Sequence, residues 1–449
     1  MVVAAFFRRL FITSIGLALL GYAFLGRGFA YIGIPPLYVD AVLWGLAFLA
    51  LLFNPGRVKL FKLSVGWLLL TFMTWGTFRT LPYVAEYGLD ALRDSVIYAY
   101  GLFALGVSGL LLRKGNLDFV SKWYAKWSPW FVLWVPVSIM IYRLFGEILP
   151  KWPWGPGGGV PVINPKYGDF GVHLVGVMAF LVLGLHRDYY QGLFSKVREW
   201  VLWGAWGTSV LVLGTLNRGS FVTVLMGVFF ALFLHFSRRW LKPVVIASVV
   251  LFGLYIAGVE VDLGGARKVS YEQIVLNIES ILGNTDVSYL ESSKQWRLNW
   301  WKKILGYTIY GDYFWLGKGF GINLAADDGF QNADGTLRSP HNSHLMILAR
   351  MGVPGFVLWF MLQFLFAFSL FVAFIRARSV NQSRLARLYL WVLIYWFAFM
   401  TNANFDVFLE SPQGGVWFWS LFGYGLALLI SRRRSHRVRA ATASAGTGD

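Results

Sequence analysis

The run Ser339-Pro340-His341-Asn342-Ser343-His344-Leu345 ends the longest polar connection in this chain and opens a hydrophobic segment that continues beyond Phe356. A tryptophan-rich stretch that begins at Trp296 lies upstream, and Gly317, Gly319 and Gly321 stand between the two. Almost everything else is apolar. In such a chain, we expect chemistry where a long polar connection brings His and Arg side chains to the start of a helix.

Composition excludes an ordinary soluble protein. The 449 residues are 57% hydrophobic, 18% aromatic and only 14% charged, with a mean hydropathy of +0.57. These values predict an all-α polytopic membrane protein. The net charge of +18 does not indicate nucleic-acid binding, because the basic residues separate apolar runs and form no continuous stripe. The absence of cysteine excludes disulfides, thiolate metal sites and cysteine nucleophiles.

About twelve stretches are long and apolar enough to cross roughly 30 Å of hydrocarbon as helices. The first follows Arg8 and Arg9 and lacks the small-residue cleavage site of a signal peptide, so we interpret it as a span. The tenth is overlong, which indicates a tilted helix or one that projects from the bilayer. The expected spans lie near residues 6–25, 37–53, 60–78, 91–112, 128–149, 171–186, 200–215, 217–236, 241–259, 343–375, 386–405 and 413–430.

Basic residues near the span ends predict the orientation, because positive charges are retained in the cytoplasm. The end at Arg8 and Arg9, every second connection and the C-terminal end together hold about 24 of the 40 Lys and Arg residues. Both termini are therefore expected in the cytoplasm. Arg218 and residues 260–342 are then expected on the outer side.

The spans divide the chain into four parts. Residues 1–259 hold spans one to nine, 260–342 form one long outer loop, 343–430 hold spans ten to twelve, and 431–449 are expected to be a disordered basic cytoplasmic tail. The outer loop is rich in aromatic residues and has an amphipathic pattern from Tyr271 to Leu282, which predicts short helices along the membrane surface. A second outer connection, residues 150–170, is rich in Gly and Pro and predicts turns.

His341 is the principal catalytic candidate. It follows Pro340 at the start of span ten, where the N-terminus of a helix favours nearby anions. Imidazole titrates near neutrality and suits a general base that deprotonates a sugar hydroxyl. The alternative is that Asn342 or Ser343 caps the helix and His341 faces water. His344 lies on a similar face, but a histidine pair without nearby carboxylates is a poor metal site.

Arg218 and Arg297 are candidate anion ligands. Arg218 stands between two apolar spans, where an arginine commonly lines a cavity or meets an anion, although it can also extend to the interface. Arg297 lies among other basic residues, including Lys302, and could instead be a solvated face. Further outer-side arginines are better interpreted as anchors of helix ends: Arg79, Arg93 and Arg143.

A histidine base and fixed cations on the outer face suit a donor that already carries a charged leaving group, such as a lipid diphosphate. Guanidinium groups bind diphosphate through two hydrogen bonds and stabilise the charge that develops as the glycosidic bond breaks. Such a reaction requires no ATP, no metal and no other cofactor in principle, and the sequence has no clustered ligand set.

The run His341-Asn342-Ser343-His344-Leu345, followed by Gly352 and Gly355, resembles the signature of the O-antigen ligase and polymerase superfamily of bacterial polysaccharide assembly. Arg297 with Trp300, the Gly317-x-Gly319-Phe320-Gly321 segment and Asn217-Arg218-Gly219 extend the resemblance over residues 200–430. At residue 217, before Arg218, this chain has Asn where the family would lead us to expect a small residue such as Ser.

The resemblance implies a type-C-like, metal-independent, inverting glycosyltransferase in the bacterial inner membrane. Its donor would be glycan on undecaprenyl diphosphate at the periplasmic side. In that interpretation His341 activates the acceptor hydroxyl, Arg218 and Arg297 hold the diphosphate, and three residues support them: Asn342, His344 and Lys302.

The resemblance leaves the acceptor open. A ligase would transfer the glycan to a lipid A core sugar, whereas a polymerase would transfer it to another lipid-linked repeat unit. We favour the ligase and keep the polymerase as the alternative. A transporter of lipid-linked sugar is less well supported, because the long outer loop has no equivalent in the other half of the chain. Membrane lipids are the other expected partners.

Overall fold

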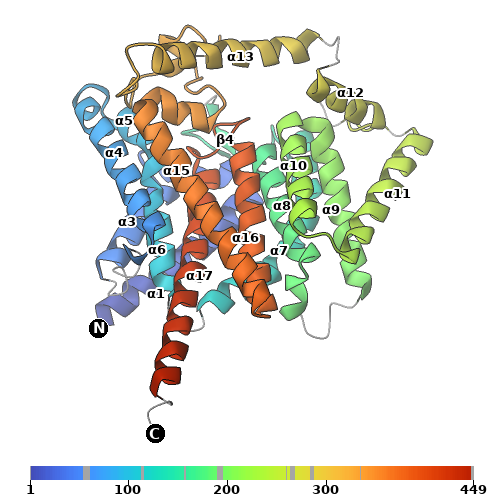
Figure 1. The fold of residues 1–449 in the computed structure, drawn as a ribbon. Coiled ribbons are helices and arrows are strands. Elements are labelled where there is room, and N and C mark those ends of the chain that lie inside the picture. The colour runs from blue at the N-terminus through green and yellow to red at the C-terminus, as the bar shows by residue number, and fades with distance from the viewer. Residues whose placement is uncertain are drawn as a thin grey trace.

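The computed structural model describes residues 2–53, 61–112, 116–155, 158–189, 196–258, 260–262, 268–283, 288–333 and 335–445. Over these residues the chain is a bundle of α-helices with two short β-hairpins (Figure 1). The hairpins pair β1 (Gly33–Ile34) with β2 (Leu37–Tyr38) and β3 (Lys151–Trp152) with β4 (Val160–Pro161), both antiparallel. The all-α polytopic membrane class expected from composition is confirmed.

Helices coincide with all twelve expected spans. Six are long and apolar enough to cross a membrane, a seventh span is possible if a bent pair counts as one, and three shorter apolar helices are also present in the described residues. The number twelve therefore stays a prediction. The helices at the expected spans are α1 (Val2–Leu25), α3 (Val39–Leu52), α4 (Ser64–Tyr87), α5 (Leu89–Ala99) with α6 (Gly101–Leu111), α7 (Asn116–Phe145), α8 (Tyr167–Val182), α9 (Lys196–Leu216), α10 (Arg218–Leu234), α11 (Leu241–Ala257), α15 (Ser343–Ser379), α16 (Ser383–Asn402) and α17 (Pro412–Ala445).

The last span is central to the bundle. In the most apolar part of α17, 94% of the residues are buried inside the protein. In the span that contains α11 only 11% are buried, and this helix lies at the edge of the bundle (Figure 1). Small residues allow the close packing of α17, as is common between membrane helices. A side chain at Gly423 would approach the carbonyl oxygen of Ala104 in α6 to 2.7 Å.

Helix α15 explains the overlong tenth span, because it consists of two helices joined at Gly352. The backbone there has φ 67° and ψ −175°, which is not helical. A Cβ at this position would lie 2.6 Å from the carbonyl oxygen of Phe314, so glycine is required. The segment with Gly317 and Gly319 fits into the kink, where the amides of Lys318 and Gly319 donate to the carbonyls of Ala349 (2.7 Å) and Arg350 (3.1 Å).

The long connection before α15 forms a layer across one end of the bundle. It contains α12 (Tyr271–Leu282), α13 (Ser288–Ile309) and α14 (Leu324–Asp327). Figure 1 shows α12 and α13 across one end of the bundle and both chain ends at the opposite end. Helix α12 has the bounds of the amphipathic pattern in the sequence.

The structure differs from the expectation at the C-terminal end. Helix α17 continues to Ala445, beyond residue 430, so residues 431–445 are helical where the composition predicted a disordered tail. The physical reason is local, because arginine and alanine dominate this stretch and are strong helix formers.

Candidate active site

His341 stands at the junction of the outer loop with α15 in an unusual backbone conformation. Its φ is 53°, and among the described non-glycine residues only Asn381 shares a positive φ. Such a conformation costs free energy and persists where neighbours fix it, often at functional sites. The neighbours here are Trp301, which donates from Nε1 to the carbonyl of Pro340 at 2.8 Å, and Asn342. The Asn342 side chain caps α15 by accepting from two amides at 3.0 Å.

The imidazole of His341 faces a carboxylate from another element. Nδ1 lies 4.0 Å from Oδ1 of Asp406, which follows α16, and the two side chains are 32% and 21% exposed. Asp406 also forms an ion pair of 3.0 Å with Lys166, the residue before α8. Burial alone would raise the pKa of Asp406, but Lys166 and His341 hold it well below its usual range. The carboxylate is therefore ionised beside the imidazole at every physiological pH.

Ser343 fixes the position of Asp406 relative to His341. Its hydroxyl donates to the Asp406 carbonyl at 3.2 Å and accepts from the amides of Phe408 (3.1 Å) and Leu409 (3.2 Å). The Ser343 amide donates to the Ala403 carbonyl at 2.8 Å. These bonds join the start of α15 to the connection between α16 and α17. They hold the histidine and the carboxylate in one rigid unit.

Arg297 approaches the same connection from α13. Its guanidinium donates from Nη1 to the carbonyl of Phe405 at 3.2 Å, next to Asp406. Burial lowers the pKa of Arg297 from its usual value, and the charge of Asp406 partly restores it. The structure thus brings His341 and Arg297 to one turn of chain, and their membership of one site stays a prediction.

Arg218 is placed differently. It begins α10, whose N-cap Asn217 accepts from the Ser220 amide at 2.8 Å. This cap gives a structural reason for asparagine at the position where we expected a small residue. The start of α10 borders the site, because a side chain at Gly219 would meet Cβ of Phe405 at 3.1 Å. The Arg218 guanidinium itself donates to the Ser280 hydroxyl in α12. Arg218 therefore contacts α12, whereas Arg297 contacts the turn at Phe405.

The other two predicted residues have separate environments. His344 is buried; its Nδ1 accepts from Trp359 at 3.1 Å, which leaves Nε2 to donate to the Met400 carbonyl at 3.1 Å. Both ring nitrogens are occupied, so His344 packs the start of α15 and holds no ion. Lys302 is exposed on α13. Across the described residues, no group of three or more His, Asp or Glu side chains could hold a metal ion.

Two residues of this cluster, Asp406 and Lys166, were not predicted. Both stand in connections between expected spans, one after span eleven and one before span six, and neither belongs to a motif. Asp169, one turn into α8, was also missed; it is 2% exposed, and neither carboxylate oxygen has a hydrogen-bond partner. The only available signal was that each is a charged residue at the outer end of an apolar span.

A second buried ionic group holds the glycine-rich segment in place next to α15. Arg350 is 1% exposed and forms an ion pair of 2.8 Å with Asp94 in α5. It also donates to the carbonyl of Gly319 at 3.1 Å. Arg79, which we interpreted as an anchor, donates to the Leu316 carbonyl at 2.6 Å. These arginines fix the loop that fills the kink in α15, and through it the direction in which α15 begins.

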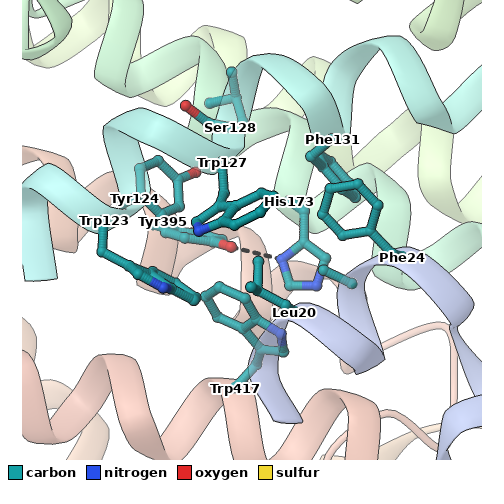
Figure 2. A pocket seen from close by; sticks show the side chains of 12 residues that line it. Leu20, Phe24, Trp123, Tyr124, Trp127, Ser128, Phe131, His173, Tyr395 and Trp417 are labelled. Atoms are coloured by element: carbon teal, nitrogen blue, oxygen red, sulfur yellow. Dashed lines mark hydrogen bonds between the residues drawn. The ribbon is translucent and has the colours of Figure 1, made fainter. Parts of the chain in front are cut away.

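A small cavity inside the bundle is not part of this site. It has a volume of about 30 Å³ and is lined mainly by aromatic side chains of α1, α7, α8, α16 and α17 (Figure 2). His173 in α8 points into it, and its Nδ1 lies 2.5 Å from the Tyr395 hydroxyl. A cavity of this size holds about one or two water molecules. Its apolar lining is unsuited to a charged donor.

Comparison with known proteins finds a family similarity for part of the chain. Residues 203–360 match the family model described as O-antigen ligase. Over this segment the chain is similar to the O-antigen ligase superfamily. The matched O-antigen ligase segment contains Arg218, Arg297 and His341, whereas Lys166 and Asp406 lie outside it. No curated protein matches the chain.

This similarity supports a multi-pass membrane enzyme of the ligase or polymerase type, with glycosyltransferase-like chemistry. The family implies lipid-linked glycans as substrates.

Proposed function

We propose that this chain is an O-antigen ligase-type glycosyltransferase of the bacterial inner membrane. It transfers glycan from undecaprenyl diphosphate to an acceptor hydroxyl on the periplasmic side, where α12 and α13 lie, and both termini are cytoplasmic. The observation that carries the proposal is the partly exposed imidazole of His341, held in a strained conformation beside the ionised carboxylate of Asp406. Sugar hydroxyls need such a base to become nucleophiles.

The reaction is a direct displacement at the anomeric carbon. His341 accepts the proton of the acceptor hydroxyl at Nε2, and the acceptor oxygen forms a bond to the anomeric carbon from the face opposite the leaving group. The bond from that carbon to the diphosphate oxygen breaks, and its electron pair leaves with the lipid diphosphate. The product therefore has inverted configuration, and the proton passes from His341 to solvent.

Asp406 stabilises the imidazolium that forms during this step. The distance of 4.0 Å is an ion-pair distance, and catalytic contacts of this kind commonly shorten when substrate binds. Asp406 orients the ring through Nδ1, so that Nε2 remains for the acceptor. Asn342 and His344 act indirectly, because they fix the first turn of α15 on which His341 stands.

Arg297 and Arg218 hold the donor diphosphate, and Lys302 supplies a further cation on α13. Arg297 reaches the connection at Phe405 from α13, and Gly219, the neighbour of Arg218 in α10, borders the same residue. Guanidinium groups stabilise the growing negative charge on the leaving group, which supports a mechanism that needs neither ATP nor a metal ion.

The donor role can be tested in reconstituted enzyme with purified lipid-diphosphate donor. Arg297→Lys keeps the charge and loses the paired donors, so we expect the donor KM to rise about 10-fold or more. The matched control is Lys268→Gln, because Lys268 is an exposed cation of the same loop whose partner is Glu260. A donor KM that changes equally in both variants would contradict the assignment.

Deletion of the gene in its host separates ligase from polymerase. Loss of surface glycan with long chains accumulating on the carrier lipid supports the ligase. Accumulation of single repeat units, on the carrier or attached to the acceptor, instead identifies a polymerase. A transporter is identified if repeat units are retained on the cytoplasmic side.

A further inference from the structure

A polar cavity of about 480 Å³ includes in its lining Asn164, which lies two residues before Lys166 of the candidate active site. It lies where the C-terminal end of α7 meets the β3–β4 hairpin and the start of α2 (Arg27–Ala30). None of its lining residues belongs to α10, α13 or α15. It is therefore separate from the elements that carry Arg218, Arg297 and His341.

The charges that line this cavity are predominantly positive. Arg27, Arg143 and Lys151 contribute three cations, and Glu147 contributes one carboxylate. The side chain of Glu147 is 97% exposed and pairs with Lys151 at 3.0 Å, so solvent screens it strongly. The lining has an excess of two positive charges, which favours an anionic occupant.

Neutral phenols hold the two guanidinium groups in position. Arg143 donates from Nε to the Tyr167 hydroxyl at 2.9 Å, and Arg27 donates from Nη2 to the Tyr31 hydroxyl at 3.3 Å. A phenol orients a guanidinium without cancelling its charge. Both guanidinium groups are thus oriented at the cavity by hydrogen bonds to tyrosine side chains.

The cavity wall leads directly to the candidate active site. The amide of Arg27 donates to the Asn164 carbonyl at 2.9 Å, and a side chain at Gly26 would approach the same oxygen to 2.4 Å. Two residues after Asn164, Lys166 pairs with Asp406 at 3.0 Å. Burial and the two neighbouring aspartates have the largest effects on the pKa of Lys166, and the positive charge of Arg27 lowers this pKa by a smaller amount. A molecule bound at Arg27 would therefore lie next to the residues that orient His341.

We propose that this cavity binds an acidic group, a phosphate or a carboxylate, of the acceptor whose hydroxyl His341 deprotonates. The inference rests on the proposed function and adds a second anion site to it. The donor diphosphate occupies the side of the Phe405–Asp406 turn formed by α10 and α13. The acceptor occupies the side formed by α7, β3, β4 and α2, and the reacting groups meet at His341.

The binding test uses the full chain, purified in detergent, and three sugars that differ only in their acidic group. Glucose, glucuronate and glucose 6-phosphate are titrated at constant ionic strength, and heat of binding is measured. We expect both acidic sugars to bind at least 10-fold more tightly than glucose. The double variant Arg27→Gln/Arg143→Gln should weaken them at least 10-fold, whereas Arg93→Gln, which removes an exposed outer cation elsewhere, should not. Equal affinity for all three sugars, or full affinity in the double variant, would overturn the proposal.

Two further variants separate a lost site from a lost fold. Lys151→Gln removes one cation from an exposed side chain and should weaken the acidic sugars by a smaller factor. Arg143→Lys keeps the charge and should retain most of the affinity. If the double variant does not fold, these two single variants test the proposal. Unchanged binding of the acidic sugars in Lys151→Gln, together with lost binding in Arg143→Lys, would overturn a charge-based site.

Other occupants give distinct results. Loss of acidic-sugar binding in Arg218→Gln/Arg297→Gln, with retention in the cavity variant, would assign the sugar to the donor site and overturn the inference. Competition by phosphatidylglycerol but not phosphatidylcholine in nanodiscs would assign the cavity to a lipid headgroup, with the same consequence. If His341→Ala keeps its turnover while acidic sugars still require Arg27 and Arg143, the catalytic proposal fails and the anion site remains.

Discussion

Nδ1 of His341 lies 4.0 Å from Oδ1 of Asp406, although 65 positions separate the two residues in the chain. Ser343 creates this proximity, because its hydroxyl binds the Asp406 carbonyl and the Phe408 amide, and its own amide binds the Ala403 carbonyl. The pair resembles other catalytic arrangements in which a carboxylate orients a histidine base. It gives the proposed base a fixed direction.

His341→Ala should lower turnover by about 10²- to 10⁴-fold, because the acceptor hydroxyl loses its general base. The measurement is product formation by purified enzyme with saturating donor and acceptor. Asn381→Ala is the matched control, since Asn381 has the other positive φ among the described non-glycine residues and lies at the opposite end of α15. Turnover of the His341 variant close to that of the unchanged enzyme would remove the base from the mechanism.

Asp406→Asn should lower turnover about 10- to 100-fold, because the imidazolium loses a neighbouring charge. The informative measurement is the double variant with His341→Ala. If Asp406 acts through His341, its replacement adds no further loss once the histidine is absent. Multiplied losses in the double variant would show that Asp406 acts independently, for example by positioning Lys166.

Asp94→Asn should destabilise the protein by about 3 kcal/mol, because it leaves Arg350 buried without its counter-charge. Arg350 is 1% exposed and lies 2.8 Å from the carboxylate. Lys268→Gln provides the comparison: Lys268 is 53% exposed and pairs with Glu260 at 2.9 Å, so its loss should cost less than about 1 kcal/mol. Thermal unfolding in one detergent measures both. Equal shifts in melting temperature would mean that burial of the pair does not matter.

Glu410→Gln should change the pH dependence of stability. Burial raises the pKa of Glu410 to about 8, whereas glutamate in an unfolded chain titrates near about 4.3. Between these values the folded state holds a proton that the unfolded state has released, so the free energy of unfolding falls as the pH rises. The variant lacks this loss, and its melting temperature relative to the unchanged protein should be higher at pH 8.5 than at pH 5. An equal difference at both pH values, as expected for exposed Glu279→Gln, would contradict the buried titration.

The sequence determined the local features of this protein. Apolar runs long enough to cross a membrane fold as helices in almost any context, so the helices coincide with the expected spans, and the amphipathic pattern from Tyr271 to Leu282 became α12. The signature residues His341 and Arg297 were also readable, since motif and chain position mark them directly. Asn342 could be expected as a cap, because capping depends only on the residues that follow it.

Only the tertiary structure decided which distant residues meet. The partnership of Asp406 with His341 and Lys166 joins three separate connections, and no local pattern encodes such a pairing. The kink at Gly352 depends on the loop at Phe314 that packs into it, and the central position of α17 depends on glycines that face α6. Helices form from neighbours in the chain, whereas a site between helices is fixed by packing, hydrogen bonds and charges that come together only when the bundle closes.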